Sequence, residues 1–345
     1  MSRCDRFAVD RGRMPRRATS SLDREALARV LREQDGVVSR AQLGEVGAAR
    51  ADVRRLLARR ELHVVHPGVY VDHSGRPTRR QREWAAVLVC APAALHRESA
   101  LEAHGMTRDR TSPGTDGTIH LLVDRERRIV PPSGVTIERV TDHASWVQAN
   151  RRPPRAHLDY ALLKTAAART EADAIGLLSD AVHQGLTTPA RLLEVIAKLP
   201  RLPRRAVLGE VLADVTAGTR SVLEQRYLRD VERAHALPSG ERQVREGTAS
   251  GTVHRDVRYP AERTLVELDG AFGHRDAVDR WADLQRDLDA ALDDHVTLRP
   301  GWAQVLEPCR LARLVGEVLG RRGWAGRPQP CGAACTVDSG AEDPT

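Results

Sequence analysis

The chain has 345 residues, of which 41% are hydrophobic and only 3% are aromatic, and its net charge is +7. This length suits two or three domains whose cores are built mainly by Leu, Val and Ala. The longest apolar runs contain proline and fall short of a membrane span, and the N-terminus has no apolar signal segment. We therefore expect a cytoplasmic protein without membrane contact.

The cysteines agree with that compartment, because an odd number without a framework indicates reduced thiols. They are Cys4, Cys90, Cys309, Cys331 and Cys335. The last two lie in a tail over 325–345 that is rich in Gly and Pro and that we predict to be disordered. With no second Cys or His pair nearby in the sequence, no zinc site is expected there.

The positive charge is concentrated at the N-terminal end. Residues 1–80 hold 18 arginines and 10 acidic residues, whereas the remaining 36 basic and 37 acidic residues nearly cancel. A basic segment on a neutral body is typical of a nucleic-acid-binding end. Compositional drift is the alternative, since Lys164 and Lys198 are the only lysines. A general preference for arginine does not explain why the excess lies at one end.

The N-terminal elements follow the order of a winged helix-turn-helix. Residues 1–20 are Arg-rich without a hydrophobic period, which predicts a disordered basic tail. The hydrophobic spacing then predicts helices at 22–34, 40–46 and 49–60 and two strands within 62–72. Ser39 is a natural N-cap for the second helix. Helix, helix, turn, helix and hairpin predict a winged domain over 21–75.

Between residues 50 and 59 the third helix of this domain carries four arginines against one aspartate, and in a winged helix it enters the major groove. The second helix would begin near a backbone phosphate. An Arg-rich protein could place arginines on any surface helix, but those of 276–293 are balanced by aspartates. DNA binding is therefore favoured, although winged helices also contact proteins. The predicted DNA-binding residues are Ser39, Arg40, Arg50, Arg54, Arg55, Arg59 and Tyr70.

This part of the chain resembles the N-terminal domain of the AbiEi-type antitoxin family. The resemblance rests on Gly36-Val-Val-Ser-Arg-Ala-Gln-Leu43, Val53-Arg-Arg-Leu-Leu-Ala-Arg-Arg60 and His66-Pro-Gly-Val-Tyr70. It continues through His96-Arg-Glu-Ser-Ala-Leu-Glu-Ala-His-Gly105 and covers about the first third of the chain. It implies a DNA-binding regulator that works with a cognate toxin.

Residues 76–202 are predicted to form a helical connector with a β-hairpin. The hairpin strands are 119–123 and 135–140, separated by a Pro-Pro-Ser-Gly turn. Residues 150–155 have the composition of a linker. The predicted helices are 77–91, 97–105 and most of 157–198. No motif in 77–200 carries recognisable chemistry, so we expect this part to connect and pack.

Residues 203–324 are predicted to form a small mixed sheet flanked by helices, which makes the whole chain α+β. The predicted strands are 241–246, 251–258, 263–269 and 295–299. The predicted helices are 204–216, 219–235, 276–293 and 307–321.

Three carboxylates stand out in this block. Asp256 lies near the end of one strand, and Glu267 and Asp269 follow at i and i+2 on the next. Alternate strand residues point to one face, so the latter two should project together with Leu265. Charges between apolar strand residues are costly to bury unless they bind something. A divalent cation is the simplest ligand for such a set.

The same block resembles the PD-(D/E)XK nuclease superfamily, in particular the uncharacterised family related to very-short-patch-repair endonucleases. The matching pieces are Ser221-Val-Leu-Glu224, Asp256, Val266-Glu-Leu-Asp-Gly270, His274, Arg286-Asp287 with Leu292, and Val296-Thr-Leu-Arg-Pro-Gly-Trp302. The resemblance implies DNA cleavage with Mg²⁺ or Mn²⁺, which activates water and neutralises charge on the phosphate. Asp256 and Glu267 would be the primary ligands, and Asp269 and Glu224 would complete the set.

Two further residues receive roles from this resemblance. His274 would act as general base or acid, because its pKa lies near neutrality. Arg286 would hold a phosphate. The superfamily usually places Lys two residues after the Glu, but here that position is Asp269 and no lysine follows residue 198. The related family often lacks this lysine as well.

Structural alternatives exist for most of these residues. Glu224 follows Ser221 by three positions and fits a capping box. Asp269 and Gly270 form a common turn dipeptide, and His274 suits an exposed loop. Asp256 and Glu267 have the weakest structural alternative. Two functions remain open: a Mg²⁺-dependent DNA endonuclease, or an AbiEi-like regulator or antitoxin whose nuclease-fold domain does not cut.

Overall fold

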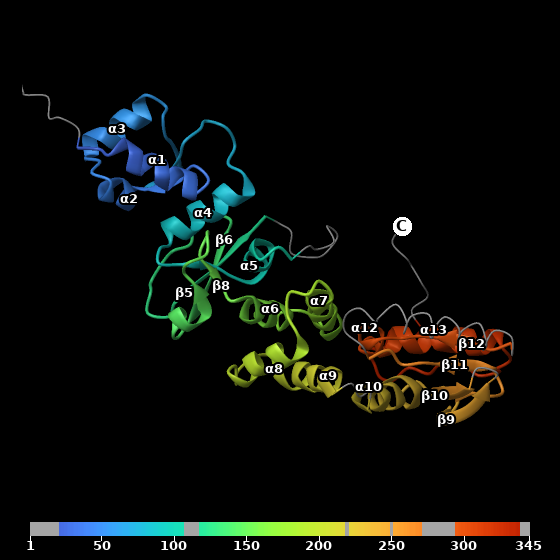
Figure 1. The fold of residues 1–345 in the computed structure, drawn as a ribbon. Coiled ribbons are helices and arrows are strands. Elements are labelled where there is room, and N and C mark those ends of the chain that lie inside the picture. Colours follow the sequence, from blue (N-terminus) through green and yellow to red (C-terminus); the bar gives the residue numbers. More distant parts are fainter. Residues whose placement is uncertain (1–20, 107–116, 218–220, 249–250, 271–293, 339–345) are drawn as a thin grey trace, which may run out of the picture.

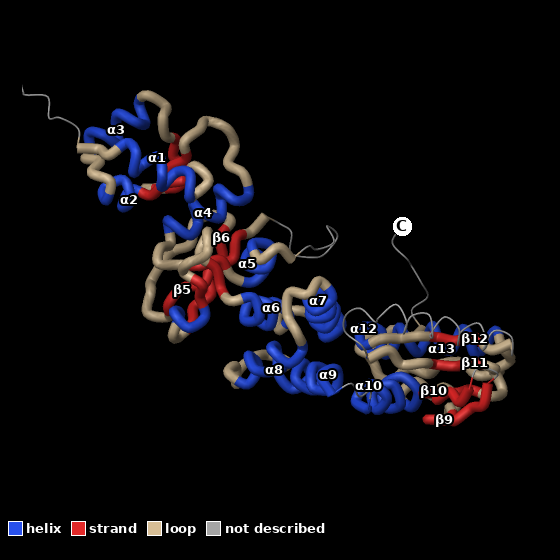
Figure 2. Tube along the Cα trace, viewed as in Figure 1, coloured by secondary structure: helices blue, strands red, loops and turns tan. Residues whose placement is uncertain are grey.

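The computed structural model describes residues 21–106, 117–217, 221–248, 251–270 and 294–338. These residues form an α+β protein with three sheets, as predicted. The sheets follow one another along an elongated molecule, with α1–α3 at one end and β9–β12 at the other (Figure 1). Figure 2 separates the strands into these three groups, with a layer of helices between the second and the third.

The first sheet belongs to a winged helix-turn-helix. Its elements are α1 (Arg24–Glu33), β1 (Val37–Ser39), α2 (Arg40–Glu45), α3 (Arg50–Ala58), β2 (His63–His66) and β3 (Val69–Val71). The strands are antiparallel in the order β1-β3-β2. Ser39 begins α2 through a capping box, in which its hydroxyl accepts from the Gln42 N–H at 3.2 Å. Leu27, Leu43 and Leu56 fill the core between the helices.

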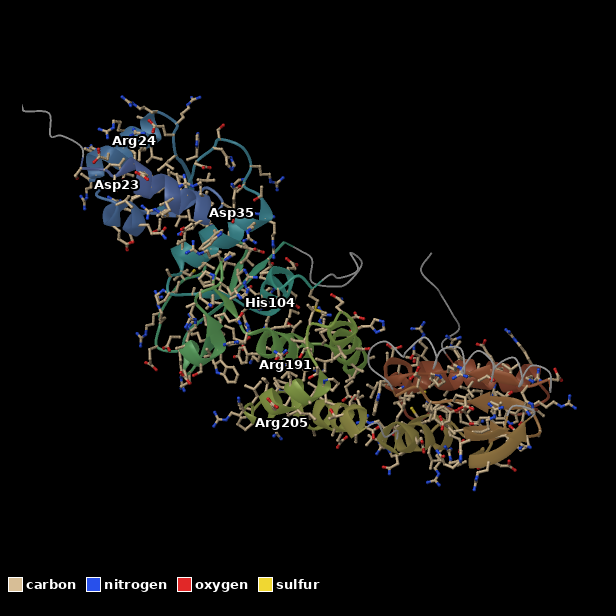
Figure 3. The ribbon with its side chains drawn as sticks, viewed as in Figure 1. Asp23, Arg24, Asp35, His104, Arg191 and Arg205 are labelled. Carbon is tan, nitrogen blue, oxygen red and sulfur yellow. The ribbon has the colours of Figure 1, made fainter. Side chains whose placement is uncertain are left out.

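Helix α4 (Arg79–Val89) joins this domain to the next sheet. Its Trp84 packs against valines from β1 and β3, on the sheet face away from α1–α3. The Trp84 indole N–H and the Arg80 guanidinium both donate to the Asp35 carboxylate, at 3.0 and 2.8 Å. Figure 3 shows Asp35 at this junction. The apolar and charged contacts together fix α4 against the winged helix.

The second sheet corrects the predicted hairpin. Its elements are β4 (Ala94–Leu95), α5 (Arg97–Ala103), β5 (Ile119–Asp124), β6 (Val135–Val140), a 3₁₀ turn (His143–Trp146), β7 (Val147–Gln148) and β8 (Arg155–Ala156). The strand order is β6-β5-β4-β8-β7, and β5 and β6 are parallel, with Ile119 opposite Val135. The prediction of a hairpin was wrong. Residues 125–134 can span up to about 33 Å, and they return the chain from the end of β5 to its start, so that β6 runs parallel to β5.

The predicted linker at 150–155 is also part of this sheet. Arg155 and Ala156 are buried in β8, between β4 and β7. The Leu95 N–H donates to the Pro154 carbonyl at 2.8 Å, which extends the pairing beyond the strand itself. The Pro-rich segment therefore leads into an interior strand of the sheet and is not a linker.

Four helices follow the second sheet. They are α6 (Leu158–Ala166), α7 (Glu171–His183), α8 (Pro189–Ala197) and α9 (Arg205–Ala217). Helix α6 is buried along most of its length against α5 and α7. Thr188 caps α8 ahead of Pro189 at its first turn, as the sequence predicts. One continuous apolar cluster runs from α4 through these helices into the third sheet.

The third sheet is mixed and has the predicted element order. Its elements are α10 (Ser221–Arg226), a π-helical segment (Tyr227–Arg233), β9 (Glu241–Thr248), β10 (Gly251–Tyr259), β11 (Thr264–Val266), β12 (Val296–Leu298), α12 (Trp302–Val305) and α13 (Pro308–Arg321). The strand order is β12-β11-β10-β9, antiparallel except for the parallel pair β11–β12. Predicted helix 276–293 lies outside the described residues, as do 1–20.

The tail after α13 is folded over the described range 325–338, which corrects the prediction of disorder there. The Gln329 N–H donates to the His235 carbonyl at 2.8 Å, and Val337 is buried. Pro328 lies so close to Gly316 of α13 that an added Cβ would meet its Cγ at 2.3 Å. The tail therefore packs against α13. Among the described residues, no helix is both long and apolar enough to cross a bilayer.

Candidate functional site

The third sheet presents the predicted carboxylates on two neighbouring strands. Val257 of β10 pairs with Val266 of β11, so the next position in register places Asp256 opposite Glu267. The extended backbone continues past β11, because the N–H groups of Glu267 and Asp269 donate to carbonyls at 298 and 300, at 2.9 and 3.0 Å. Glu267 and Asp269 therefore share one face of the strand.

The opposite face of this strand supports the same arrangement. Val266 and Leu268 belong to the main apolar core. Leu265 is buried but is not a member of that core, as expected for a residue on the carboxylate face. The alternation predicted from the sequence is thus present in the backbone.

Asp256 and Glu267 are largely buried and influence each other. Asp256 is 8% exposed, and one of its carboxylate oxygens accepts from the Leu268 N–H at 2.8 Å. Burial, and next the charge of Asp256, raise the pKa of Glu267 above its ordinary value. The pair thus holds two acidic groups where water screens them poorly.

A buried arginine opposes part of this repulsion. Arg255 donates to Glu246 at 2.9 Å and contacts Glu267 at 3.4 Å. Its charge lowers the pKa of Glu267, but burial and Asp256 together outweigh it. Arg255 also anchors the Glu267 side chain toward β9, which limits the conformations that the carboxylate can adopt.

Asp269 borders a neighbouring cleft of about 250 Å³ between α7 and the segment that follows β12. Arg299 lines the same cleft, together with Asp180 and Ser179 of α7. The cleft therefore combines Asp180 of α7 with Asp269 and with Arg299, which follows β12. Asp269 lines this cleft and lies two residues after Glu267 on the same face of the extended segment.

The other predicted members of the site fall into two groups. Glu224 lies half-buried on α10, and its place in the metal set stays a prediction. His274 and Arg286 lie outside the described residues.

The predicted DNA-binding residues are placed on the winged helix as follows. Arg50 and Arg54 of α3 and Arg40 of α2 are exposed, and no ion pair to them occurs among the described residues. Arg55 is half-buried and contacts Asp52 at 2.5 Å, and Arg59 is 3.9 Å from Glu61. Part of the predicted positive charge is therefore neutralised within the domain.

Two of the predicted contacts have structural roles. Tyr70 is 5% exposed and its ring lies in the core among the leucines of α1–α3. Its prediction as a DNA contact was wrong because β3 is the central strand of the small sheet. Ser39 is almost fully buried, and its hydroxyl is used by the cap of α2.

A polar cluster in the second sheet was missed by the sequence analysis, which assigned no chemistry to 77–200. Glu138 of β6 lies 3.4 Å from the His96 Nε2 and 2.5 Å from the Lys164 Nζ, and accepts from Arg97 at 2.9 Å. His96 is fully buried and stacks on Tyr160 of α6. The signal available in the sequence was a charged Glu138 directly after the apolar Ile137 of a predicted strand.

This cluster combines a buried histidine with three partly exposed charged side chains. Burial lowers the pKa of His96. Burial alone would raise the pKa of Glu138, but His96 and Lys164 outweigh it and hold that pKa far below its usual range. A cavity of about 230 Å³ borders the cluster and is lined by His96, Arg97, His120, Leu121, Thr136, Ile137 and Glu138. The network ties β6 to α5 and α6.

Comparison with known proteins yields little. No protein-family model matches the chain, and no curated protein matches it. Among solved structures, it is similar to the crystal structure of the RV2827C protein from Mycobacterium tuberculosis, with 19% sequence identity and a TM-score of 0.35. The match covers 60% of this chain and 82% of that chain.

Proposed function

We propose that the protein binds DNA through its winged helix and cleaves the phosphodiester backbone at the carboxylate pair of the third sheet. The observation that carries the proposal is the register of β10 and β11, which places Asp256 opposite Glu267 directly after β11. Two mutually repelling carboxylates in a largely buried position are unfavourable unless a cation compensates them. The raised pKa of Glu267 is the expected signature of such a pair.

The residues present fit a Mg²⁺ or Mn²⁺ ion. Both ions prefer oxygen ligands, and Mg²⁺ is often held by one or two carboxylates with retained waters. Asp256 and Glu267 would hold the ion, and Asp269 would bind it further or orient a water. When bound, the ion supplies an activated water and neutralises charge on the phosphate. The Leu268 N–H orients the Asp256 carboxylate, and Arg255 orients that of Glu267.

The proposed DNA-binding surface consists of Arg40, Arg50 and Arg54. These side chains are exposed on α2 and α3, where they would meet phosphates and the edges of bases. Arg55 and Arg59 would contribute less, because acidic neighbours already engage them. Figure 1 places α3 and β10 at opposite ends of the molecule, so the nuclease would cut away from the sequence contacted by α3.

A regulator or antitoxin that does not cut DNA is the second candidate. It is favoured by the contact between Arg255 and Glu267, which already compensates part of the acidic charge without a metal ion. It is also favoured by the absence of any lysine after residue 198, since the nuclease pattern usually includes one. In this case a cognate toxin would be the partner, and the third sheet would serve as a binding domain.

Plasmid nicking distinguishes the two candidates. Purified protein is incubated with supercoiled DNA and Mg²⁺ or Mn²⁺, beside Glu267→Gln and the matched surface control Glu241→Gln. Nicking by the wild type and by Glu241→Gln, but not by Glu267→Gln, supports cleavage at the pair. Equal nicking by all three indicates a contaminant. No nicking of several substrates, combined with salt-dependent DNA binding, supports the regulator.

A further inference from the structure

Four potential metal ligands from three separate parts of the chain meet beside α13. They are His235, which follows the π-helical segment, Cys309 in the first turn of α13, and Cys331 and Cys335 of the tail. Their ligand atoms all lie within 4.8 Å of one another. No zinc site was predicted here, because no second pair of Cys or His residues lies near Cys331 and Cys335 in the sequence. The partners are 22 and nearly 100 residues away from the tail cysteines.

The distances match a tetrahedral zinc centre. The sulfur of Cys309 lies 3.6 Å from that of Cys331 and 3.5 Å from that of Cys335, whose sulfur is 3.6 Å from the His235 Nε2. Zinc bonds of about 2.3 Å to sulfur and about 2.0 Å to nitrogen, at tetrahedral angles, place two sulfurs about 3.8 Å apart and a sulfur and a nitrogen about 3.5 Å apart. Both separations are reproduced within a few tenths of an ångström.

The surroundings orient the ligands for this role. The His235 Nδ1 lies 3.1 Å from the Val231 carbonyl oxygen, so its N–H donates there and the lone pair of Nε2 faces the sulfurs. His235 is fully buried, which fixes the ring. Cys309 stands in the first turn of the 14-residue α13, so the helix fixes its position relative to the tail.

We propose that His235, Cys309, Cys331 and Cys335 form a structural Zn²⁺ site that fastens the C-terminal tail to the third-sheet domain. Four protein ligands close the coordination sphere and leave no open position for substrate, which is typical of structural zinc. The site crosslinks the tail to the first turn of α13 and to the end of the π-helical segment. It would supply folding energy to a tail that buries little apolar surface of its own.

Metal analysis of the full chain tests this proposal. Protein purified without chelators from zinc-supplemented cells is expected to carry about one zinc per chain. Cys331→Ser removes an exposed ligand that lies outside the apolar core, and it should weaken zinc binding by more than about 100-fold. Cys90→Ala and Cys4→Ser are the controls and should retain zinc. Cys90 is a free cysteine at the C-terminal end of α4, and Cys4 lies outside the described residues.

Cobalt provides a second readout. The wild type reconstituted with Co²⁺ should show a thiolate-to-cobalt charge-transfer band and the visible bands of a tetrahedral site, and Cys331→Ser should lose intensity in the former. Absence of both zinc and these bands in the wild type would overturn the proposal. So would equal zinc in the wild type and Cys331→Ser, or an intact mass showing a Cys309–Cys331 disulfide in the freshly purified protein.

Discussion

Asp256 of β10 stands opposite Glu267, which directly follows β11 in the antiparallel register, and burial together with the charge of Asp256 raises the pKa of Glu267. The Leu268 N–H, one residue further on, donates to Asp256 and fixes this arrangement. The pair is therefore a rigid feature of the sheet, with an electrostatic cost in the metal-free protein. A site of this kind is expected to trade stability for function.

Replacing Glu267 should stabilise the metal-free protein at neutral pH. Burial raises its pKa above the ordinary value of 4.5, so its ionised form is less favourable in the folded than in the unfolded state. The free energy of unfolding of the wild type therefore falls as pH rises from about 4.5 through the pKa of Glu267 in the folded state. Urea unfolding of Glu267→Gln at pH 7 should give a higher free energy of unfolding than that of the wild type.

The same difference should shrink toward pH 4, where the wild-type carboxyl binds its proton. Glu241→Gln, at a mostly exposed position of β9, is the matched control and should change stability little. A Glu267→Gln variant that is less stable at pH 7 would mean that the ion pair with Arg255 outweighs burial.

Neutral substitution of the exposed arginines should weaken DNA binding and reduce its salt dependence. Each lost phosphate contact lowers the slope of log affinity against log salt by about 0.9. Arg50→Ala combined with Arg54→Ala should therefore lower that slope by about 2, measured by fluorescence anisotropy on a duplex. The control pair is Arg201→Ala with Arg205→Ala, near the start of α9. An equal loss in the control pair would reject α3 as the recognition helix.

Glu232 should be essential for the stability of the third-sheet domain. It is buried, lies 2.7 Å from Arg242 and accepts from the Tyr259 hydroxyl at 2.9 Å. Tyr259 in turn contacts the Tyr227 hydroxyl, which joins the π-helical segment to β10. Glu232→Ala should lower the free energy of unfolding by about 3–5 kcal/mol, because the arginine and tyrosine lose a buried partner.

Thermal and urea unfolding measure this effect, and Glu241→Ala provides the comparison. That residue is 55% exposed and pairs loosely with Arg258 at 3.8 Å. Its loss should cost less than about 1 kcal/mol. Similar costs for the two variants would show that the Glu232 network is not stabilising.

Mild acid should destabilise the second-sheet domain through two buried histidines. Burial lowers the pKa of His96 and of His104 below 6.5. The unfolded state therefore binds protons first as pH falls, so stability is full above about pH 6.5 and declines below it, by up to about 1.4 kcal/mol per pH unit for each histidine. Unfolding free energies measured from pH 7.5 to 5 should show this slope.

His104→Asn should reduce the dependence of unfolding free energy on pH by the contribution of one histidine. The His104 ring contacts the Ala156 carbonyl and is separate from the Glu138 network. Figure 3 shows its position beside the second sheet. His183→Asn, at the end of α7, is the control. A variant slope equal to that of the wild type would exclude His104 as a source of the acid sensitivity.

The features that could be predicted from the sequence are those that depend on residues close together along the chain. The capping box at Ser39, the alternation from Leu265 to Asp269 and the order of elements in the third sheet were all recognisable, because each depends on neighbours a few residues apart. Periodicity also predicted the amphipathic α13, which begins one residue later than expected.

The features that the sequence did not predict depend on distant partners. Strand 135–140 could pair in either direction, and β4 and β8, two residues each, were too short to recognise. The burial of Tyr70 follows from its central strand. Glu138 gains its role from His96 and Lys164, and the tail cysteines gain theirs from His235 and Cys309. Such contacts emerge only when the sheets are assembled.

The most direct test of the central claim is the number of Mn²⁺ ions that bind at Asp256 and Glu267, measured by electron paramagnetic resonance. The protein is first saturated with Zn²⁺, so that the proposed zinc site does not take up Mn²⁺. The wild type and Glu241→Gln should each bind about one or two ions, in competition with Mg²⁺. Asp256→Asn and Glu267→Gln should each abolish that binding while unfolding cooperatively. Undiminished Mn²⁺ binding by both variants, or none by the wild type, would contradict a metal site at this pair.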